Sequence, residues 1–532
     1  MAIKSLGLNN LGKSFGLLSE ISNPSFKFNC FALDKLTEGA KMHIAAGIDT
    51  FKIYIAPDKL AAKSIQEKLS SWGIRVGYLQ ERGDVLINKK NFASNEDKDR
   101  IATLDKIIRK ELDVLVISAE TALQRFPRPE IIKQFSIDIK EEDLVNPMQL
   151  VNSLINAGFV REEMVSEPGE IALRGDILDI CINNGECYRV SFFDELIENI
   201  KIIDLETMKV KGEIKKLHIT PLSEAIISYE TVEKAKKRLA DASKTSSIAG
   251  EMIELVHEGA CDNSLLWALP YIEEDYVNIF EFTEFPVVIV DEPKMVFDAI
   301  TIYRKNYDEK LARLIAVGEA LRDHARSILY TEQFRAGLQK SRVLMFASMM
   351  VSSQNLKPEK IITIKCKPVS KYYLDVKKFI IDLKLFTQDK YKVILCCGDE
   401  AGVQTMQETL ERNGISATYS KDADGNEGIY ITPLSITTGA IYPDAKVAII
   451  GFTDCIGKKH ENIVYSHKTM FTEPKPGDYV VHRVHGIGIC DGTTFLKNGN
   501  AEREYYIIRF RDDDILYVPT DQTDNLQKIC RS

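Results

Sequence analysis

Two runs of alternating strand-forming residues close the chain and restrict this segment to a small curved sheet. The runs, GDYVVHRVHGIGICDGTTFLKNG and EREYYIIRFRDDDILYVPTDQ, lie within residues 473–532. Residues 505–510 and 515–518 alternate on either side of an acidic turn, which predicts a β-hairpin. Gly486 and Gly488 should let the preceding strand bend. We therefore expect a small barrel that binds another protein rather than an active site.

The length of 532 residues exceeds what one hydrophobic core supports, so several domains are expected. The hydrophobic content of 45% and the charged content of 28% are typical of a soluble protein. Apolar runs stay below the roughly 18 residues of a membrane span, and the N-terminus lacks an apolar signal core. The sequence thus predicts a cytoplasmic protein without a membrane partner. Its net charge of −9 argues against a surface built throughout to neutralise DNA phosphates.

Ten cysteines are scattered along the chain without a C-x-x-C pair, which predicts neither a disulfide framework nor a zinc cluster. Cys396 and Cys397 lie in the apolar run VILCC, and we interpret them as buried, reduced thiols of a core. His482 and His485 are three residues apart and lack a further ligand at suitable spacing. No metal site is expected.

Residues 1–140 and 351–460 each show the strand–helix alternation of a parallel α/β sheet. In the first segment, the strand FKIYIAP precedes a helix that Asp58 should cap, and a second helix over 96–112 leads into the strand DVLVISA. In the other, residues 391–416, YKVILCCGDEAGVQTMQETLERNGIS, repeat this layout. The patterns predict an α/β multidomain protein.

Residues 141–222 change character, because alternating apolar positions and Gly or Asn turns recur about every ten residues. We interpret them as a small α+β insert that is entered through the helix PMQLVNSLINAG. Residues 223–350 are mostly helical, with one apolar strand, FPVVIVDEP, and should form the second part of the first α/β domain.

A phosphate-binding loop pattern, G-x-x-x-x-G-K-S, occurs at the start of the chain, formed by Gly7, Gly12, Lys13 and Ser14. A working loop leaves a buried strand and opens a helix, so that backbone N–H groups face the phosphates. Only MAIKSL precedes this pattern, and Pro24 ends any following helix early. We expect no nucleotide site here. Asp291 and Glu292, which could ligate Mg²⁺ opposite a phosphate, should instead cap the turn that follows their strand.

Arg161 and Arg174 are the strongest candidates for contact with a partner. Each follows an alternating run, so its guanidinium could project from a sheet edge toward carboxylates of another protein. An internal ion pair with Glu162, Glu170 or Asp176 fits the sequence equally well. Both interpretations remain open.

The C-terminal segment resembles the RNA-polymerase-interacting domain that CarD-type regulators share with bacterial transcription-repair coupling factors, whose versions carry a similar GDYVVH, HGIG and LYVP series. The resemblance implies a Tudor- or SH3-like barrel that sets an exposed strand edge against the polymerase β subunit. The matching segment is GTTFLKNG (492–499), and the resemblance assigns the contact to Leu496 with its neighbours Phe495 and Lys497. Leu496 could alternatively belong to the barrel core. Since Phe495 and Leu496 point to opposite faces, one of them should be exposed.

The insert resembles the UvrB-homology module of the same coupling factors in three phrases, GFVREEMV, EPGEIALRGDILDI and YRVSFFDELIENIKIIDLETMK. In that family the module binds the damage-recognition protein UvrA. The resemblance gives this role to Arg161 and Arg174, with Gly175 beside them. The first α/β domain is then expected to be UvrB-like.

Three departures from the family pattern bear on these roles. Asp176 replaces the second glycine of the family motif, and Met208 and Lys209 stand where a Gln-Arg pair is usual. The segment FALDKLTEGAKMHIAAG (31–47) occupies the place of the UvrB phosphate loop but contains no G-K-S or G-K-T. No cofactor is therefore expected in this chain.

Complete members of the family are ATP- and Mg²⁺-dependent DNA translocases whose motor follows the polymerase-binding domain. Because the sequence ends at Ser532, we expect an adaptor for transcription-coupled nucleotide excision repair. It should have two docking surfaces and carry out no chemistry, and it should reach DNA only through that motor. Two alternatives remain: an ATP-dependent helicase-like enzyme that uses residues 7–14 with Asp291 and Glu292, or a CarD-type transcription regulator.

Overall fold

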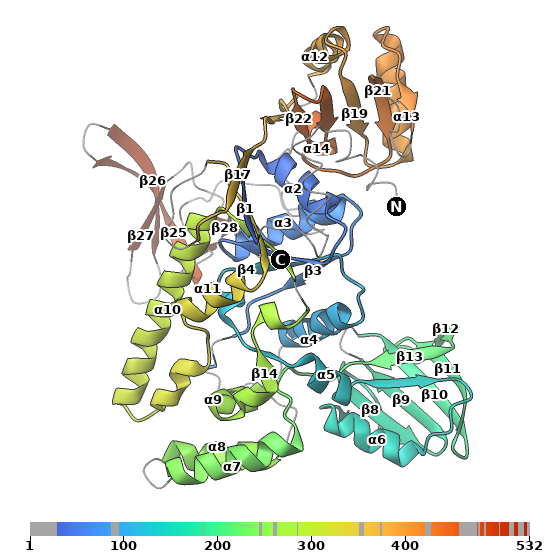
Figure 1. Ribbon diagram of the computed structural model, residues 1–532, viewed down its shortest axis with the longest axis vertical. Coiled ribbons are helices and arrows are strands. Elements are labelled where there is room, and N and C mark those ends of the chain that lie inside the picture. The colour runs from blue at the N-terminus through green and yellow to red at the C-terminus, as the bar shows by residue number, and fades with distance from the viewer. Residues whose placement is uncertain are drawn as a thin grey trace. The chain divides into compact units, whose positions relative to one another are not determined.

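Figure 1 shows the computed structural model of the chain, which divides into two compact units, residues 1–458 and 459–532. Each unit is described by itself. The structure describes residues 29–83, 85–86, 95–182, 185–243, 247–258, 263–284, 286–349, 356–372, 375–420, 427–456, 476, 479–482, 486–498, 501–509, 515–519 and 526–528.

A seven-stranded parallel sheet forms the centre of the first domain, in the order β17-β1-β16-β15-β2-β4-β3. Its strands are β1 (Cys30–Asp34), β2 (Lys52–Ala56), β3 (Val76–Leu79), β4 (Val114–Ser118), β15 (Val287–Asp291), β16 (Arg342–Phe346) and β17 (Lys360–Thr363). The predicted parallel α/β fold is confirmed. The expectation of a single strand within 223–350 is wrong, because β16 lies beside β15 and fills the position next to β1.

Helices cover both faces of this sheet and enclose two apolar cores. They are α2 (Glu38–Gly47), α3 (Lys59–Ser71), α4 (Asn95–Ile108), α5 (Pro129–Phe135), α10 (Pro293–Ala316) and α11 (Thr331–Gln339). As predicted, Asp58 caps α3: its side chain accepts a hydrogen bond from the Ala61 N–H at 2.8 Å. A helical pair, α7 (Tyr229–Ser243) and α8 (Ser247–Glu258), packs around Trp267 with the short α9 (Leu269–Ile272). A two-stranded sheet joins β5 (Phe126–Pro127) to β14 (Tyr276–Val277).

The insert is a six-stranded sheet in the order β12-β11-β10-β9-β8-β7, attached through a two-stranded neck. Its strands are β7 (Val160–Arg161), β8 (Glu170–Arg174), β9 (Ile177–Cys181), β10 (Cys187–Phe193), β11 (Leu196–Ile203) and β12 (Val210–Ile214), and the neck pairs β6 (Ile137–Lys140) with β13 (Lys216–Ile219). Helix α6 (Pro147–Asn156) packs Leu150, Val151 and Leu154 against one face of the sheet. The opposite face, called the outer face below, carries the candidate arginine Arg174.

The second α/β domain has a six-stranded sheet in the order β18-β22-β23-β19-β21-β20. Its elements are β18 (Lys367–Pro368), α12 (Val376–Gln388), β19 (Lys392–Cys396), α13 (Glu400–Arg412), β20 (Thr418–Tyr419), β21 (Gly428–Thr432), β22 (Ala440–Tyr442), β23 (Val447–Ile450) and α14 (Phe452–Ile456). The repeat of the strand–helix step is confirmed, since Asp399 caps α13 as Asp58 caps α3. Cys396 and Cys397 are buried as expected, and burial raises the pKa of Cys397 to about 12.

One disulfide departs from the expected set of reduced thiols. Cys181 on β9 and Cys187 on β10 face each other across the antiparallel pair and are bonded, with their Cα atoms 4.1 Å apart. Six other cysteines of the described chain are free: Cys30, Cys366, Cys396, Cys397, Cys455 and Cys490. The two cysteines are six residues apart and are directly paired across β9 and β10. A search for C-x-x-C pairs does not detect a disulfide of this spacing.

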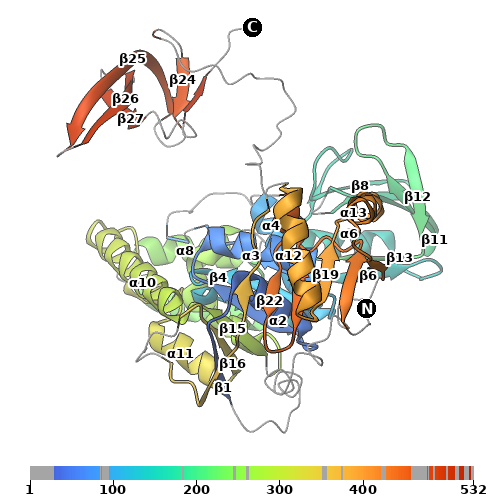
Figure 2. The same cartoon turned by 90° about the horizontal axis from the view of Figure 1, so that it is seen from above.

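The second unit is a five-stranded antiparallel sheet in the order β27-β26-β25-β24-β28. It comprises β24 (Tyr479–His482), β25 (Gly486–Asn498), β26 (Ala501–Arg509), β27 (Ile515–Pro519) and β28 (Leu526–Lys528). The predicted hairpin is confirmed by the pairing of β26 with β27. Figure 2 shows β25 as one long bent strand.

The pairing register of β25 with β26 shifts between Cys490 and Gly492, and Gly492 has a φ of 119°. The shift is a β-bulge, and its positive φ is a backbone conformation that only glycine adopts readily. The register shift thus lies farther along the strand than Gly486 and Gly488, the glycines that we expected to allow the bend. Within the described residues, every helix is too short or too polar to span a lipid bilayer.

The neck of the insert is joined to the first domain through His218 on β13. Its Nδ1 lies 2.8 Å from a carboxylate oxygen of Asp138 on β6, and its Nε2 lies 3.0 Å from Asp105 on α4. The hydrogen bond to Asp105 raises the pKa of His218; burial and the charge of Arg109 oppose this effect, and Asp138 supports it. The imidazole of His218 therefore links β13 to β6 and to α4.

We expect the pH dependence of stability to report this contact. Because folding raises the pKa of His218, the stabilisation is complete below the unfolded value of about 6.5 and disappears as pH rises through the higher folded value. Melting followed by circular dichroism between about pH 5.5 and pH 8.5 should show His218→Gln losing stability at the acidic end. The exposed Lys216→Gln on the same strand should keep the wild-type profile. Parallel profiles for wild type and His218→Gln would contradict this account.

Candidate functional site

The carboxyl edge of the first sheet is where parallel α/β domains usually bind ligands. Here the edge is closed by an ion cluster. The Nζ of Lys41, in the first turns of α2, lies 2.6 Å from Oδ1 of Asp291 and 2.6 Å from Oε1 of Glu292. The side chains of Lys41 and Asp291 are only 8% and 11% exposed. Burial opposes the charge of Lys41, but the two carboxylates outweigh it and raise its pKa.

The second α/β domain covers the N-terminal turn of α2. A Cβ atom on Gly39 would lie 1.9 Å from the backbone oxygen of Gly439, so the two main chains are in direct contact. Farther along α2, the ring of His43 stacks on Trp72 and its Nδ1 lies 2.9 Å from the hydroxyl of Tyr442. Burial lowers the pKa of His43 to about 4, which keeps the ring neutral. The N-terminal turn of α2 therefore lies against the second α/β domain.

Carboxylates also line the neighbouring strand ends. Asp58, Glu81 and Glu120 follow β2, β3 and β4, and Ser118 donates a hydrogen bond to Glu81 at 2.8 Å. Burial and a hydrogen bond to Glu81 raise the pKa of Glu120 to about 7. Negative charge at this edge disfavours a phosphate ligand.

Asp291 and Glu292 thus have a structural role, but not the one expected. Glu292 occupies the cap position of α10 without a side-chain cap bond, and its carboxylate accepts from Lys41 and from the Ser348 N–H and hydroxyl. Sequence reasoning missed Lys41 as their common partner. The pattern of Gly7, Gly12, Lys13 and Ser14 lies outside the described residues.

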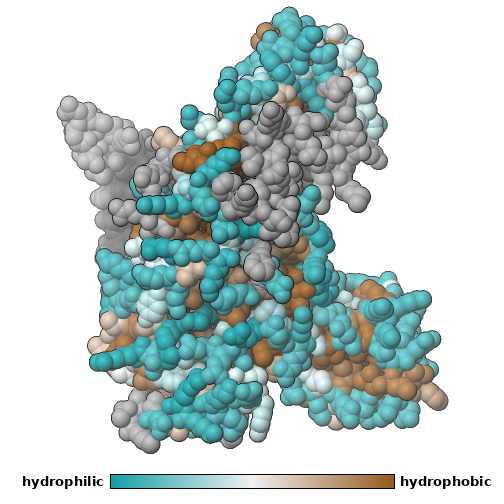
Figure 3. Space-filling view, in the orientation of Figure 1, coloured by the Kyte–Doolittle hydropathy of each residue, from teal (hydrophilic) through white to brown (hydrophobic). Residues whose placement is uncertain are grey.

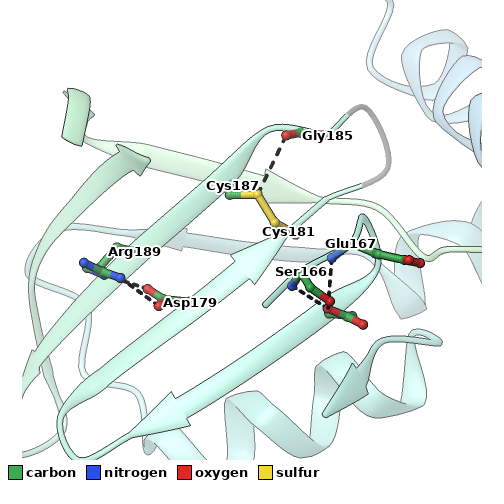
Figure 4. The surroundings of a disulfide bond; sticks show 8 residues. Ser166, Glu167, Asp179, Cys181, Gly185, Cys187 and Arg189 are labelled. Atoms are coloured by element: carbon green, nitrogen blue, oxygen red, sulfur yellow. Dashed lines mark hydrogen bonds and ion pairs between the residues drawn. A yellow bond between two sulfur atoms is a disulfide. The ribbon is translucent and has the colours of Figure 1, made fainter. Parts of the chain in front are cut away.

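A buried carboxylate organises the outer face of the insert. Asp179 on β9 has a fully buried side chain and lies between two arginines, as Figure 4 shows for Arg189. Its Oδ1 accepts from Nε of Arg189 at 2.7 Å, and its Oδ2 accepts from Arg189 at 2.9 Å and from Arg174 at 2.7 Å. One negative charge serves two positive charges, so these three side chains together carry a net positive charge and keep unused donors.

The sequence-predicted residues have different surroundings on this insert. Arg174 ends β8 with its side chain 47% exposed, and it pairs with Asp179 rather than with Glu162, Glu170 or Asp176. The internal ion pair therefore exists, but with a carboxylate that the sequence did not single out. Gly175 follows in an open turn with a φ of 59°, where an added Cβ would meet nothing within 4 Å.

Arg161 is exposed on β7, which pairs with β8 in parallel. Its strand partner Ile171 precedes Arg174 by three residues, about 10 Å along β8. Among described residues no ion pair of Arg161 is found. Arg189 is the functional candidate that sequence reasoning missed. Its alternation in YRVSFF, one residue before the core residue Val190, could have placed it on the outer face.

Large apolar side chains accompany these arginines. Figure 3 shows hydrophobic residues, in brown, gathering over the insert at the lower right. Ile177 begins β9 opposite Arg174 and is 38% exposed, and Phe193 ends β10 and is 70% exposed. Exposed apolar groups beside arginines are typical of protein interfaces.

The second candidate surface is an unpaired edge of β25. On one side, β25 pairs with β26 from Ile489 to Asn498; on the other, β24 pairs only with residues 486–489. Within the described part of the sheet, the edge from Thr493 to Asn498 therefore has open backbone groups. Across the bulge, Arg509 binds both carboxylate oxygens of Asp491 at 2.7 and 3.0 Å.

Phe495, Leu496 and Lys497 lie on this open segment of β25, opposite Glu504, Arg503 and Glu502. Their side chains fall outside the described atoms, so which of Phe495 and Leu496 is exposed stays a prediction. The described edge is compatible with the expected addition of a partner strand.

Two family models match the chain. The UvrB interaction domain matches residues 137–224, and the CarD-like/TRCF RID domain matches residues 475–530. Proteins named transcription-repair-coupling factor from Staphylococcus epidermidis and Staphylococcus haemolyticus are each 24% identical to this chain over 458 residues, and one from Staphylococcus aureus is 24% identical over 457 residues. Each alignment covers 82% of this chain and 39% of the relative.

These matches confirm the resemblance to transcription-repair coupling factors that the sequence motifs indicated. The chain spans about two fifths of the length of the curated relatives it matches.

The closed edge of the first sheet leads to a test of Lys41. Lys41→Ala leaves the buried Asp291 and the partly buried Glu292 without their cation, which should lower the free energy of unfolding by about 3–5 kcal/mol. Urea unfolding followed by fluorescence of the buried Trp72 measures this loss. Lys63→Ala, an exposed lysine on α3, should change stability by less than about 0.5 kcal/mol. Equal effects of the two variants would contradict the cluster's structural role.

The outer face leads to a second test. Asp179→Asn leaves two guanidinium groups without their shared carboxylate and should cost about 1–3 kcal/mol. Hydrogen–deuterium exchange read by mass spectrometry should show faster exchange in β9 and β10. Asp176→Asn, in the adjacent exposed turn, should leave exchange unchanged. Protection of β9 that survives Asp179→Asn would mean that Asp179 does not hold this face together.

Proposed function

We propose that this chain acts as an adaptor in transcription-coupled nucleotide excision repair, with UvrA bound at the insert and RNA polymerase bound at the C-terminal sheet. The observation that carries the proposal is the occurrence in one chain of matches to a UvrB interaction domain and to a CarD-like/TRCF RID domain. A protein with both can link two macromolecules without catalysing a reaction.

The UvrA contact would use the outer face of the insert. On that face, Arg174 and Arg189 would provide guanidinium donors for carboxylates of the partner, and Gly175 would let a backbone approach closely. Arg161 is paired with Ile171 on the edge strand β7, so it would contribute from the edge of the sheet rather than from the outer face. Asp179 fixes the orientation of two of these arginines before binding, which lowers the entropic cost of complex formation. Ile177 and Phe193 add apolar area next to them.

The polymerase contact would use strand addition. We propose that a strand of the polymerase β subunit pairs with the open edge of β25, and that Phe495, Leu496 and Lys497 supply specificity. The sheet would curl into the expected small Tudor- or SH3-like barrel, a shape that the bulge at Gly492 supports.

ATP, Mg²⁺ and DNA belong, in this proposal, to the longer relatives and not to the described part of this chain. The buried Lys41 cluster and the contact between Gly39 and Gly439 support a scaffolding role for the first domain. The competing helicase-like function predicts that the chain binds ATP at micromolar concentration and that Lys13→Ala abolishes binding. That result would replace the adaptor proposal.

The two contacts should be separable by substitution. In pull-downs with purified UvrA and RNA polymerase, Arg174→Glu should bind at least tenfold less UvrA than wild type. It should bind as much polymerase as wild type, because the charge is reversed only on the insert. Leu496→Arg should do the opposite. Lys133→Glu, an exposed charge reversal on α5, should retain both partners.

A CarD-type regulator would bind polymerase and show no UvrA binding in the wild type. If Arg174→Glu and Leu496→Arg each leave both interactions intact, the assigned surfaces are wrong.

A further inference from the structure

Helix α12 of the second α/β domain has one face buried in its own domain. Phe379, Ile380 and Leu383 pack into the apolar core that includes Val393 and Leu395 of β19. The Asp375 side chain caps the helix by accepting from the Lys378 N–H at 3.0 Å. The buried face therefore accounts for the folding of this helix.

The opposite face of α12 is apolar at its centre. Ile381 is 58% exposed and Leu385 is 53% exposed, and they are neighbours one turn apart. Val376, at the start of the helix, is 45% exposed but lies in line with the buried Ile380 and Leu383. Burial in the domain thus leaves two adjacent branched side chains facing solvent.

Lysines predominate around this apolar pair, and one exposed carboxylate, Asp389, follows Leu385 by one turn. Lys377, Lys378 and Lys384 are exposed within one turn or two of Ile381, and no ion pair joins them to other residues that the structure describes. The one acidic residue inside the helix, Asp382, accepts a hydrogen bond from Tyr372 at 3.1 Å and is partly buried. Lys378 also lies over the ring of Tyr372, 5.9 Å from its centroid. The exposed face therefore carries more positive than negative charge.

The neighbouring helix α13 gives the contrast. Figure 1 shows α12 and α13 beside the strands of the same sheet. The exposed residues of α13 include Gln404, Thr405, Glu408 and Glu411, and no large apolar side chain is exposed there. Arg412 on α13 is paired with Glu408 at 3.1 Å. A basic, apolar face is thus specific to α12 rather than a general property of this domain.

We propose that α12 is a third docking surface, which binds an acidic protein segment that presents two neighbouring apolar side chains. Glutamates or aspartates of the segment would pair with Lys377, Lys378 and Lys384, and its apolar residues would cover Ile381 and Leu385. The inference does not depend on the adaptor function. It gives the second α/β domain a binding role in addition to its contact with α2.

A protein partner fits this surface better than a membrane or a nucleic acid. A membrane-bound helix needs a broad apolar face, and the broad apolar face of α12 is already buried in the domain. Phosphate backbones are bound by lysine and arginine without a need for exposed Ile and Leu at the centre.

A labelled peptide tests the proposal with the full chain. The probe is a 16-residue helix with leucine pairs at i and i+4 flanked by glutamates, followed by fluorescence anisotropy. Wild type should bind it, and Ile381→Glu combined with Leu385→Glu should weaken binding at least tenfold. Lys384→Glu alone should weaken binding and reduce its salt dependence. The matched control on α13, Gln404→Glu with Thr405→Glu, should bind like wild type.

Several results would overturn the proposal. A peptide with lysines in place of the glutamates should not bind, and equal binding would show that charge plays no part. Binding that survives Ile381→Glu with Leu385→Glu would place the site elsewhere. In another outcome, the peptide fails to bind while anionic vesicles or single-stranded DNA bind through the α12 lysines. That result would assign the face to a membrane or to a nucleic acid. Self-association lost in the same double variant would assign it to a second copy. Circular dichroism melting checks that each variant is folded.

Discussion

The buried pairing of Lys41 with Asp291 and Glu292 is the constraint on which the first domain depends. It joins the first turns of α2 to the end of β15, two elements 250 residues apart in the chain. Burying three charged groups is unfavourable unless each has partners, and here the lysine, the carboxylates and Ser348 satisfy one another. Because the backbone of Gly439 lies against Gly39, the place where a nucleotide-binding domain holds phosphate is occupied by protein. The cluster and this contact thereby connect α2 to β15 and to the second α/β domain.

The insert repeats this principle on a smaller scale at its surface. Asp179 is fully buried, yet its two partners reach the surface, with Arg189 at 23% and Arg174 at 47% side-chain exposure. The buried carboxylate and the two partly exposed guanidiniums form a fixed cluster that carries one net positive charge. The disulfide between Cys181 and Cys187 joins β9 to β10 two residues along from the paired Asp179 and Arg189. Rigid presentation of a few polar groups favours specific binding.

Local patterns were predictable from the sequence, and long-range partners were not. The strand–helix steps, the cap Asp58, the buried Cys396 and the hairpin of β26 and β27 all follow from spacing within about twenty residues. The place of β16 between β1 and β15, and the choice of Lys41 as partner for Asp291, depend on contacts between distant segments. Arg174 was recognised from its motif, whereas its partner Asp179 lies one strand away and becomes visible only when the register of β8 and β9 is known.

The central claim is that one chain holds two partners at once through separate surfaces. The most direct measurement is the mass of the complex formed when the chain, UvrA and RNA polymerase are mixed, determined by size-exclusion chromatography with multi-angle light scattering. The account predicts a single species that contains all three proteins. A mixture in which UvrA displaces polymerase, or polymerase displaces UvrA, would contradict it.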